Sequence, residues 1–313
     1  MSAGQAVHCA YVTHGDCLRH EMGPGHPECP ARLSAIHDRL LFDGILDFMS
    51  IHDAPLATTG QLCRAHAPEH VEHILASTPM DGYVEVDPDT RMNPHTVVAA
   101  LRAAGAVVMA TDLVLSGECE TAFCCVRPPG HHAERAAAMG FCFFDNVAVG
   151  IHHALAVHGL QRVALVDFDV HHGNGSQDIF RDDPRVLMCS TYELGLYPFP
   201  DDTSGPNMVN VGLAPRSGGE AFRDAVESRW VPAIDEFRPQ LIVVSAGFDG
   251  HRSDEMGNLA LVEADYQWVT RRLLDLAERH CNGRLVSSLE GGYHLPSLAR
   301  SVAAHVSALI GAC

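Results

Sequence analysis

The sequence is short of positive charge. Its 313 residues include 21 basic and 39 acidic side chains, which gives a formal net charge of −18 with histidine neutral. This negative charge disfavours non-specific electrostatic binding to nucleic acid or to anionic lipid. We therefore expect neither nucleic acid nor a membrane as a partner, and a cationic ligand suits the charge better.

The chain also lacks the marks of secretion and of membrane insertion. Residues 1–17 contain no basic segment followed by a long apolar one, and no uncharged apolar run approaches membrane-spanning length. Its 11 cysteines are an odd number, irregularly spaced and without a CxxC pair, so we expect reduced and mostly buried thiols. These features predict a cytoplasmic protein.

No repeat, low-complexity tract or Ser/Gly-rich linker divides the chain, so we predict one domain over residues 1–313. Apolar segments typical of buried strands alternate with stretches that have helical periodicity. The expected strands are 7–12, 121–126, 162–168, 185–190, 241–247 and 284–289, and the expected helices are 30–41, 94–115, 146–157, 219–237, 263–280 and 296–310. This order predicts an α/β fold with a mostly parallel sheet, helices on both faces, and ligands at the carboxyl ends of the strands. Segments 13–30 and 191–207 are expected to be long ordered loops.

Residues able to bind a metal follow two of the expected strands. The sequence DFDVHHGNG begins at Asp167, and in an extended segment Asp167, Asp169 and His171 share one face. Asp249 follows another strand in SAGFD. A carboxylate, an imidazole and a second carboxylate suit Zn²⁺ or a similar divalent ion. The alternative is that these acids are solvated or act in turns.

Two other strands are followed by groups suited to proton transfer. RPPGHHAE places His131 and His132 after one strand, where one ring can accept a proton while the other carries charge. EGGY places Tyr293 after the last strand, where its hydroxyl can donate to a developing oxyanion. Histidine pairs also arise by chance among 21 histidines, and we expect His152-His153, inside a helical pattern, to serve packing or the surface.

Taken together, RPPGHHAE, GFCFFDN (140–146), DFDVHHGNG, SAGFD and EGGY resemble the zinc-dependent histone deacetylase family, in particular its class II branch and bacterial deacetylase-like amidohydrolases. The motifs appear in family order over most of the chain. The resemblance implies an open arginase/deacetylase fold with a central sheet of about eight strands. It also implies one zinc ion at the base of a narrow acyl-binding tunnel.

The resemblance further implies a role for each matching residue. Asp169, His171 and Asp249 match the zinc ligands, Tyr293 the carbonyl-polarising tyrosine, His132 the main proton-transfer histidine, and His131 its companion, paired with Asp167. Asn174 replaces an acid of class I relatives, so we expect His132 to stay neutral and able to act as a base. Gly140 and Phe141 match the tunnel wall, Gly291 lies beside the tyrosine, and Tyr197 is the expected opposing aromatic. Asp89 matches a rim residue that binds the substrate backbone, although a turn role is equally consistent. A structural K⁺ near Asp167, Asp169, His171 and Ser190 is implied as well.

The expected activity is removal of acetyl or short acyl groups from N-acyl-lysine side chains of a peptide or protein, or from similar alkyl amides. The alternatives are an acetylated polyamine as substrate and, more distantly, a weakly active acyl-lysine binding module. A binuclear manganese ureohydrolase would need further metal carboxylates, but Gly173 and His251 stand at those positions. Small bacterial relatives often associate, so a homo-oligomer is a further expectation.

The chain departs from the family after the strand at 185–190. Relatives usually have a His and then a Pro-Gly-Thr-Gly turn, whereas this chain has STYE and later YPFPDDTSG. Glu193, Asp201 and Asp202 favour either a cationic substrate or a solvated acidic loop, and we expect the solvated loop.

Overall fold

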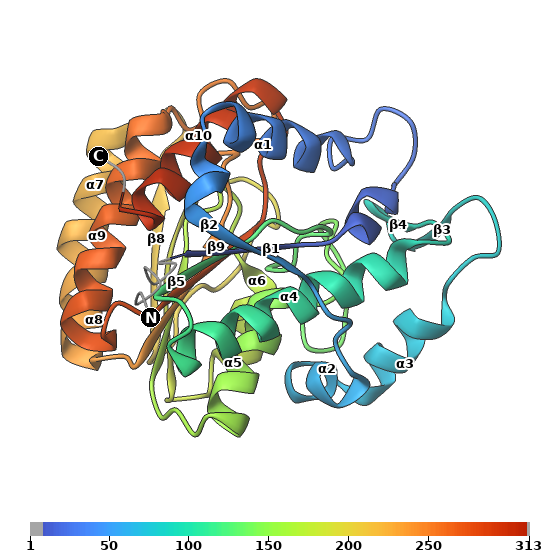
Figure 1. Ribbon diagram of the computed structural model, residues 1–313, viewed down its shortest axis with the longest axis horizontal. Helices are drawn as coiled ribbons and strands as arrows, with labels where there is room; N and C mark the ends of the chain where they lie inside the picture. The colour runs from blue at the N-terminus through green and yellow to red at the C-terminus, as the bar shows by residue number, and fades with distance from the viewer. Residues whose placement is uncertain (1–8, 312–313) are drawn as a thin grey trace, which may run out of the picture.

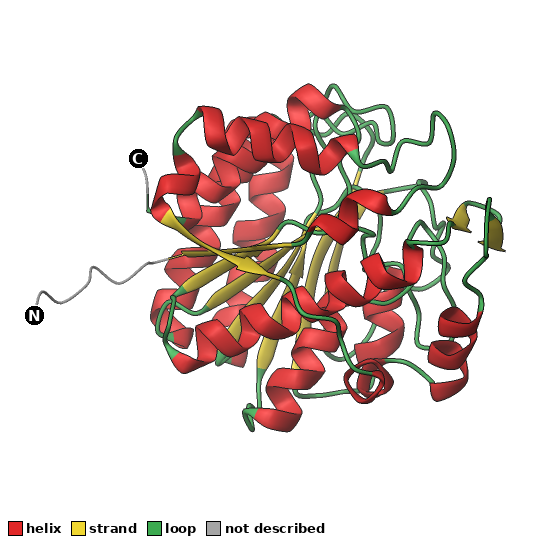
Figure 2. Ribbon diagram, turned by 45° about the vertical axis from the view of Figure 1, so that its right-hand side comes forward, coloured by secondary structure: helices red, strands yellow, loops and turns green. Residues whose placement is uncertain are grey.

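The computed structural model describes residues 9–311, which form a three-layer α/β structure around an eight-stranded parallel sheet with strand order β2-β1-β5-β10-β9-β6-β7-β8 (Figures 1 and 2). Its strands are β1 (Cys9–Thr13), β2 (Met49–Asp53), β5 (Thr121–Cys124), β6 (Val163–Asp167), β7 (Val186–Glu193), β8 (Met208–Leu213), β9 (Leu241–Ala246) and β10 (Leu285–Leu289). A separate antiparallel hairpin is formed by β3 (Val84–Asp87) and β4 (Thr90–Met92). The predicted fold class is confirmed.

Helices cover both faces of the sheet (Figure 2). The first group, α1 (Ala31–Phe42), α9 (Glu263–Cys281) and α10 (Leu295–Leu309), packs side by side over one face, and α4 (Thr96–Ser116) with α5 (Asn146–Val157) covers the other. The remaining helices are α2 (Thr59–Ala65), α3 (Pro68–Ala76), α6 (Asn174–Phe180), α7 (Gly219–Ala225) and α8 (Val231–Phe237), with short helical turns at Gly15–Arg19, Ile45–Phe48 and Val226–Trp230. All six expected helices are present, the one at 219–237 with a π-helical turn in its middle.

The central strands form a continuous apolar core. Every residue of β5, β6, β9 and β10 is buried, as expected for parallel strands covered on both faces. The six expected strands lie in these segments, in β1 and in β7. Of the ten cysteines in the described range, eight are buried and none forms a disulfide, as the sequence predicted.

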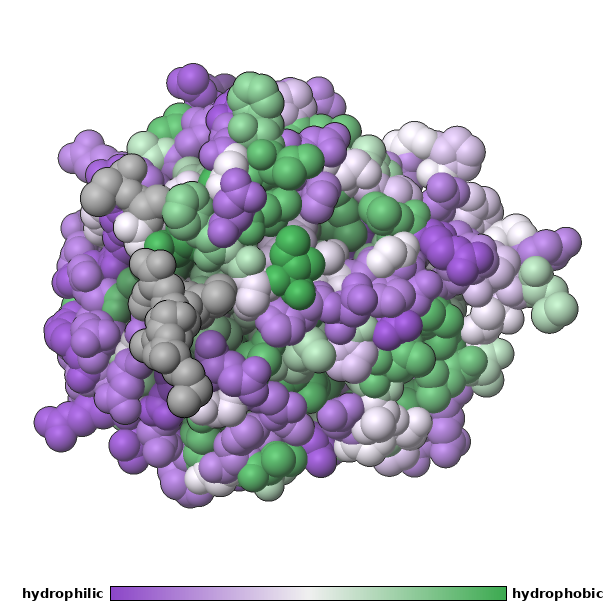
Figure 3. Space-filling view, in the orientation of Figure 1, coloured by the Kyte–Doolittle hydropathy of each residue, from purple (hydrophilic) through white to green (hydrophobic). Residues whose placement is uncertain are grey.

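Helix α4 is long and apolar enough to cross a bilayer, but 67% of its apolar window is buried. It also carries Arg102 and Asp112 and packs against α5 and strands of the sheet. These contacts are those of a core helix. The face of the molecule seen in Figure 3 has hydrophilic residues spread over it with smaller apolar areas between them.

Candidate active site

The predicted site residues follow four neighbouring strands and lie at one edge of the sheet. β5, β10, β9 and β6 are adjacent, and their carboxyl ends lead into the segments that carry His131 and His132, Tyr293, Asp249, and Asp169 with His171. Because parallel strands end at the same edge, residues more than 100 positions apart in sequence come within contact distance. The segment order alone predicted this meeting point.

Asp169, His171 and Asp249 form a buried cluster of possible metal ligands. One ligand atom from each lies within 4.8 Å of the others. His171 Nδ1 is 3.0 Å from Asp169 Oδ1 and 3.2 Å from Asp249 Oδ2, and the latter oxygen has no hydrogen-bond partner. The other oxygens of both carboxylates are held by main-chain N–H groups: Gly291 N donates to Asp169 and Val170 N to Asp249. Two oriented, buried carboxylates and one imidazole fit a divalent ion that accepts nitrogen and oxygen ligands.

His131 and His132 lie beside this cluster with ring centroids 4.0 Å apart. His131 Nδ1 is 3.0 Å from Asp167 Oδ2, and its Nε2 is 3.8 Å from Asp169 Oδ2. Burial acts to lower the pKa of His131, but the charges of Asp169 and Asp167 outweigh it and raise the pKa well above the ordinary value. The surroundings of His131 thus favour its charged form.

His132 has the opposite surroundings. Its Nδ1 lies 2.8 Å from Asn174 Oδ1, and Asn174 Nδ2 donates to Glu134 Oε1 at 2.8 Å. An ionised carboxylate only accepts hydrogen bonds, so this second bond fixes the amide with its oxygen toward the ring, and the proton of neutral His132 lies on Nδ1. Burial, followed by the charges of His131 and His171, lowers the pKa of His132 well below its ordinary value. Nε2 is therefore left with a free lone pair.

Tyr293 is positioned by groups from two other segments. Its backbone N–H donates to Asp254 Oδ2 at 2.6 Å, and the guanidinium of Arg32 lies over its ring, 4.9 Å from the centroid. Arg32 also donates to Gly292 O at 2.6 Å and to Glu290 O, which fixes the turn before the tyrosine. A cavity of about 410 Å³ is lined by Tyr293 together with Asp254, Glu255 and Met256.

The predicted wall residues lie beside the candidate catalytic side chains. The Phe141 ring lies edge-on to Tyr293 at 6.0 Å, and the Tyr197 ring lies 5.2 Å from His132 and 6.3 Å from His171. Gly140 has a φ of +56°, and a Cβ at this position would lie 2.5 Å from His132 Cδ2, so only glycine leaves the imidazole its place.

Asp89 lies in the turn between β3 and β4 and contacts the loop that forms this wall. Its Oδ1 accepts hydrogen bonds from Gly140 N at 3.1 Å and from the Thr90 hydroxyl at 2.7 Å. The carboxylate thus holds the loop that carries Phe141. A Cβ at Gly291 would lie 2.0 Å from Asp249 Oδ2, so this glycine allows the backbone to approach both carboxylates of the cluster.

The expectation of a solvated acidic loop is wrong for Glu193. Its side chain is only slightly exposed and accepts hydrogen bonds from Asn258 N at 2.6 Å and Asn258 Nδ2 at 2.8 Å. β7 continues to Glu193, because the strand extends past the apolar segment that marks it in the sequence. Asp201 and Asp202 are exposed, and Asp202 pairs with Arg181.

A buried ion-pair network behind the site was not predictable from the sequence patterns. Arg127 forms two hydrogen bonds of 2.6 Å with the carboxylate of Glu28, and Arg32 Nη1 lies 3.2 Å from the same carboxylate. All three side chains are fully buried. Arg127 stands in the motif RPPGHH, but its partner lies 99 residues earlier in a loop, and no local pattern links the two.

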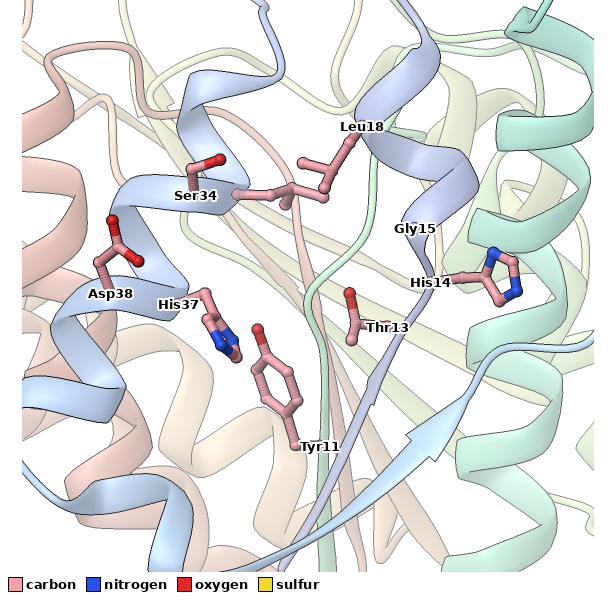
Figure 4. Close-up of a pocket in the computed structure, with 9 residues that line it drawn as sticks. Tyr11, Thr13, His14, Gly15, Leu18, Ser34, His37 and Asp38 are labelled. Carbon is pink, nitrogen blue, oxygen red and sulfur yellow. The ribbon is translucent and has the colours of Figure 1, made fainter.

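A second cavity, of about 260 Å³, lies between the end of β1 and helix α1 (Figure 4). It is lined by Tyr11, Thr13 and His14 from one side and by Ser34, His37 and Asp38 from the other. None of the predicted site residues lines it.

Comparison with known proteins supports the assignment that the motifs indicated. The model of the histone deacetylase domain matches residues 26–309. The chain belongs to the histone deacetylase family. Among its relatives are a probable deacetylase of Archaeoglobus fulgidus, 38% identical over 90% of this chain and 80% of the relative, and a histone deacetylase-like amidohydrolase of Pseudomonas aeruginosa, 36% identical over 91% and 77%.

The fold of this deacetylase-family protein also matches a solved structure. The crystal structure of the HDA15 HD domain superposes with a TM-score of 0.91 at 32% identity, covering 99% of this chain and 90% of that one. A mouse relative, polyamine deacetylase HDAC10, is 37% identical over 91% of this chain, which spans 45% of that protein. Family membership supports a hydrolase that acts on amides.

Proposed function

We propose that this protein is a zinc-dependent deacetylase that hydrolyses N-acetyl-lysine side chains, or similar alkyl amides, to acetate and a free amine. The observation that carries the proposal is the buried Asp169–His171–Asp249 cluster beside an imidazole whose Nε2 is free. A bound zinc ion would supply a Lewis acid that polarises the amide carbonyl and lowers the pKa of a water molecule. Asp249 Oδ2, buried and without a hydrogen-bond partner, fits this ion.

The side chains of this chain then perform the remaining steps. His132 Nε2 accepts a proton from the attacking water, while Asn174 Oδ1 keeps the other ring proton on Nδ1. The Tyr293 hydroxyl donates a hydrogen bond to the amide oxygen as negative charge develops there. When the C–N bond breaks, His132 returns its proton to the leaving amine. We assign this step to His132 because both ring nitrogens of His131 face carboxylates.

The apolar wall suits the slender alkyl stem of an acyl-lysine. Phe141, Tyr197 and Gly140 would flank the stem, with Gly291 beside the reacting carbonyl. Asp89, which already orders the Gly140 loop, would accept a hydrogen bond from the substrate backbone.

We also propose a structural potassium ion at the ends of β6 and β7. Ser190 pairs with Asp167 in the register of these strands, and its buried hydroxyl oxygen has no hydrogen-bond partner. Together with main-chain carbonyls near Asp167, Asp169 and His171, this oxygen suits a monovalent cation.

Two substitutions test the proposal. Asp249→Asn should lose the zinc ion of the catalytic cluster and turnover together, because it removes a charged ligand. His132→Ala should keep the zinc content of the wild type but lose turnover by roughly 10²–10⁴-fold, the usual contribution of a general base. Zinc content and acetate release are measured on the same samples. Full turnover by either variant contradicts the assignment.

An acetylated polyamine is the second candidate substrate. Glu255 lines the cavity next to Tyr293, and an acidic group there would favour a substrate with additional positive charges. The similarity to a polyamine deacetylase points the same way. Comparing kcat/KM for an acetyl-lysine peptide, N-acetylputrescine and acetylspermidine distinguishes the two candidates.

A further inference from the structure

The histidine pair His152-His153 lies outside the motifs of the site, and the structure gives its two members different surroundings. His152 stacks on Phe180, with ring centroids 5.1 Å apart. The His153 ring instead faces Asp112 of α4, with Nε2 2.8 Å from Asp112 Oδ1. His158, which caps the carboxyl end of α5, places its Nε2 2.6 Å from the same oxygen.

We propose that Asp112, His153 and His158 form a second zinc site, separate from the catalytic cluster. Their three ligand atoms lie within 4.8 Å of one another, as do those of the Asp169–His171–Asp249 cluster. The composition is two imidazoles and one carboxylate, a ligand set common for zinc and other borderline divalent ions.

The three side chains differ in how firmly they are held. The His153 side chain of α5 is 8% exposed and contacts Asp112 of α4 and Arg64 of α2, whereas the Asp112 and His158 side chains are 51% and 26% exposed. In the hydrogen-bonded arrangement the carboxylate lies close to both nitrogens, so it must draw back to admit an ion of Zn–N and Zn–O distances near 2 Å. Asp112 can do so because half of its side chain is in solvent. The solvent side also leaves room for water as a fourth ligand.

Arg64 of α2 affects how strongly this site can bind zinc. Its Nη1 lies 3.3 Å from His153 Nδ1, and a guanidinium can only donate, so Nδ1 accepts and the proton of neutral His153 lies on Nε2. Zinc binding at Nε2 moves that proton to Nδ1, where it would point at Arg64. The half-buried arginine must then turn away. Metal-binding histidines ordinarily donate their second N–H to a carboxylate or carbonyl group, so Arg64 weakens the site.

The site would join α4 to α5, the two helices that cover one face of the sheet (Figure 1). Zinc bound there should therefore stabilise the folded protein by mass action, in addition to any stabilisation from the catalytic ion.

The experiment measures zinc bound to the intact protein by equilibrium dialysis, with thermal unfolding as a second readout. We expect about two zinc ions per chain for the wild type and about one for His158→Gln and Asp112→Asn. Deacetylase turnover should be the same in all three. His73→Gln, which removes an exposed histidine of α3 outside the cluster, should behave like the wild type.

A charge-reversing variant tests the part assigned to Arg64. In Arg64→Glu a carboxylate can accept the proton of His153 Nδ1, and zinc should bind the second site about tenfold more tightly. The same zinc content in the wild type, Arg64→Glu and His158→Gln would overturn the proposal. A second ion that His158→Gln and Asp112→Asn still bind would also overturn it, because that ion would lie elsewhere.

Discussion

At the residue scale, the two adjacent histidines show how surroundings separate identical side chains. His131 faces two carboxylates, while His132 faces an amide whose orientation is fixed by Glu134. The replacement of an acid by Asn174, visible in the sequence, predicted a neutral His132, and the lowered pKa of His132 agrees with it. In this account the base is the ring without a charged partner.

Tyr293→Phe tests the single hydroxyl assigned to the carbonyl oxygen. The ring should keep its contacts with Arg32 and Phe141, but the hydrogen bond to the developing oxyanion is lost. We expect kcat to fall by roughly 10²–10³-fold with zinc content unchanged. Steady-state kinetics with metal analysis measures both, and an unchanged kcat would refute the role of Tyr293.

Burial of His305 should make the free energy of unfolding fall at acidic pH. Its ring is fully buried between Thr270 Oγ1 at 2.6 Å and Ser287 Oγ at 2.9 Å, and burial lowers the pKa to about 3. Between this value and the ordinary pKa near 6.5, the unfolded chain binds the extra proton, so stability falls as pH falls. This one group should remove about 2 kcal/mol of unfolding free energy between pH 7 and pH 5.

The matched variant for this effect is His305→Gln. It should be less stable at pH 7, because it disturbs the packing, but its stability should decline less steeply toward pH 5. Urea unfolding at several pH values measures the slope. Parallel slopes for the two proteins would show that His305 does not titrate in this way.

At the element scale, the sequence predicted the central strands and missed the edges of the sheet. β2 and β8 lie at the two ends of the strand order, and their residues are largely half-exposed, so neither reads as a continuous apolar run. The short helices α2, α3 and α6 carry too few turns to show a helical period. Catalytic candidates were predictable because each directly follows a buried strand.

The supporting groups were not predictable, because their partners lie far away in the sequence. Glu28 and Arg127 are joined only by the folded chain, and so are Asp254 and the backbone of Tyr293. The sequence neighbourhoods of Glu28 and Asp254 resemble those of ordinary loop residues. Such positions become visible only when the distances between elements are known.

Gly140→Ala tests whether the loop after β5 must approach His132 so closely. The added methyl group would overlap the imidazole, and we expect turnover to fall at least tenfold. Gly159→Ala is the matched control, because Gly159 also has a positive φ, of +69°, but has nothing within 4 Å. It should lose about 1 kcal/mol of stability and no activity. Equal activity losses in both variants would contradict the steric explanation.

At the scale of the whole molecule, the net charge of −18 should attract cationic substrates. We expect an acetyl-lysine peptide flanked by arginine to have a lower KM than one flanked by glutamate at low ionic strength. The difference should shrink at high ionic strength, because salt screens exposed charges. KM values that do not depend on the flanking charge at any salt concentration would exclude this effect.

The composition also simplifies the measurement of activity. All 21 basic residues are arginine, so the chain contains no lysine. Lysine amines detected after incubation with an acetyl-lysine peptide therefore come from the product and not from the enzyme.

The most direct test of the account is turnover of an acetyl-lysine peptide before chelation, after chelation, and after zinc is returned. We predict that the zinc-loaded protein forms free lysine amine, that chelation stops this reaction, and that the reaction recovers when about one equivalent of zinc is restored. Turnover that continues unchanged after the metal has been removed would contradict a zinc-dependent mechanism at Asp169, His171 and Asp249.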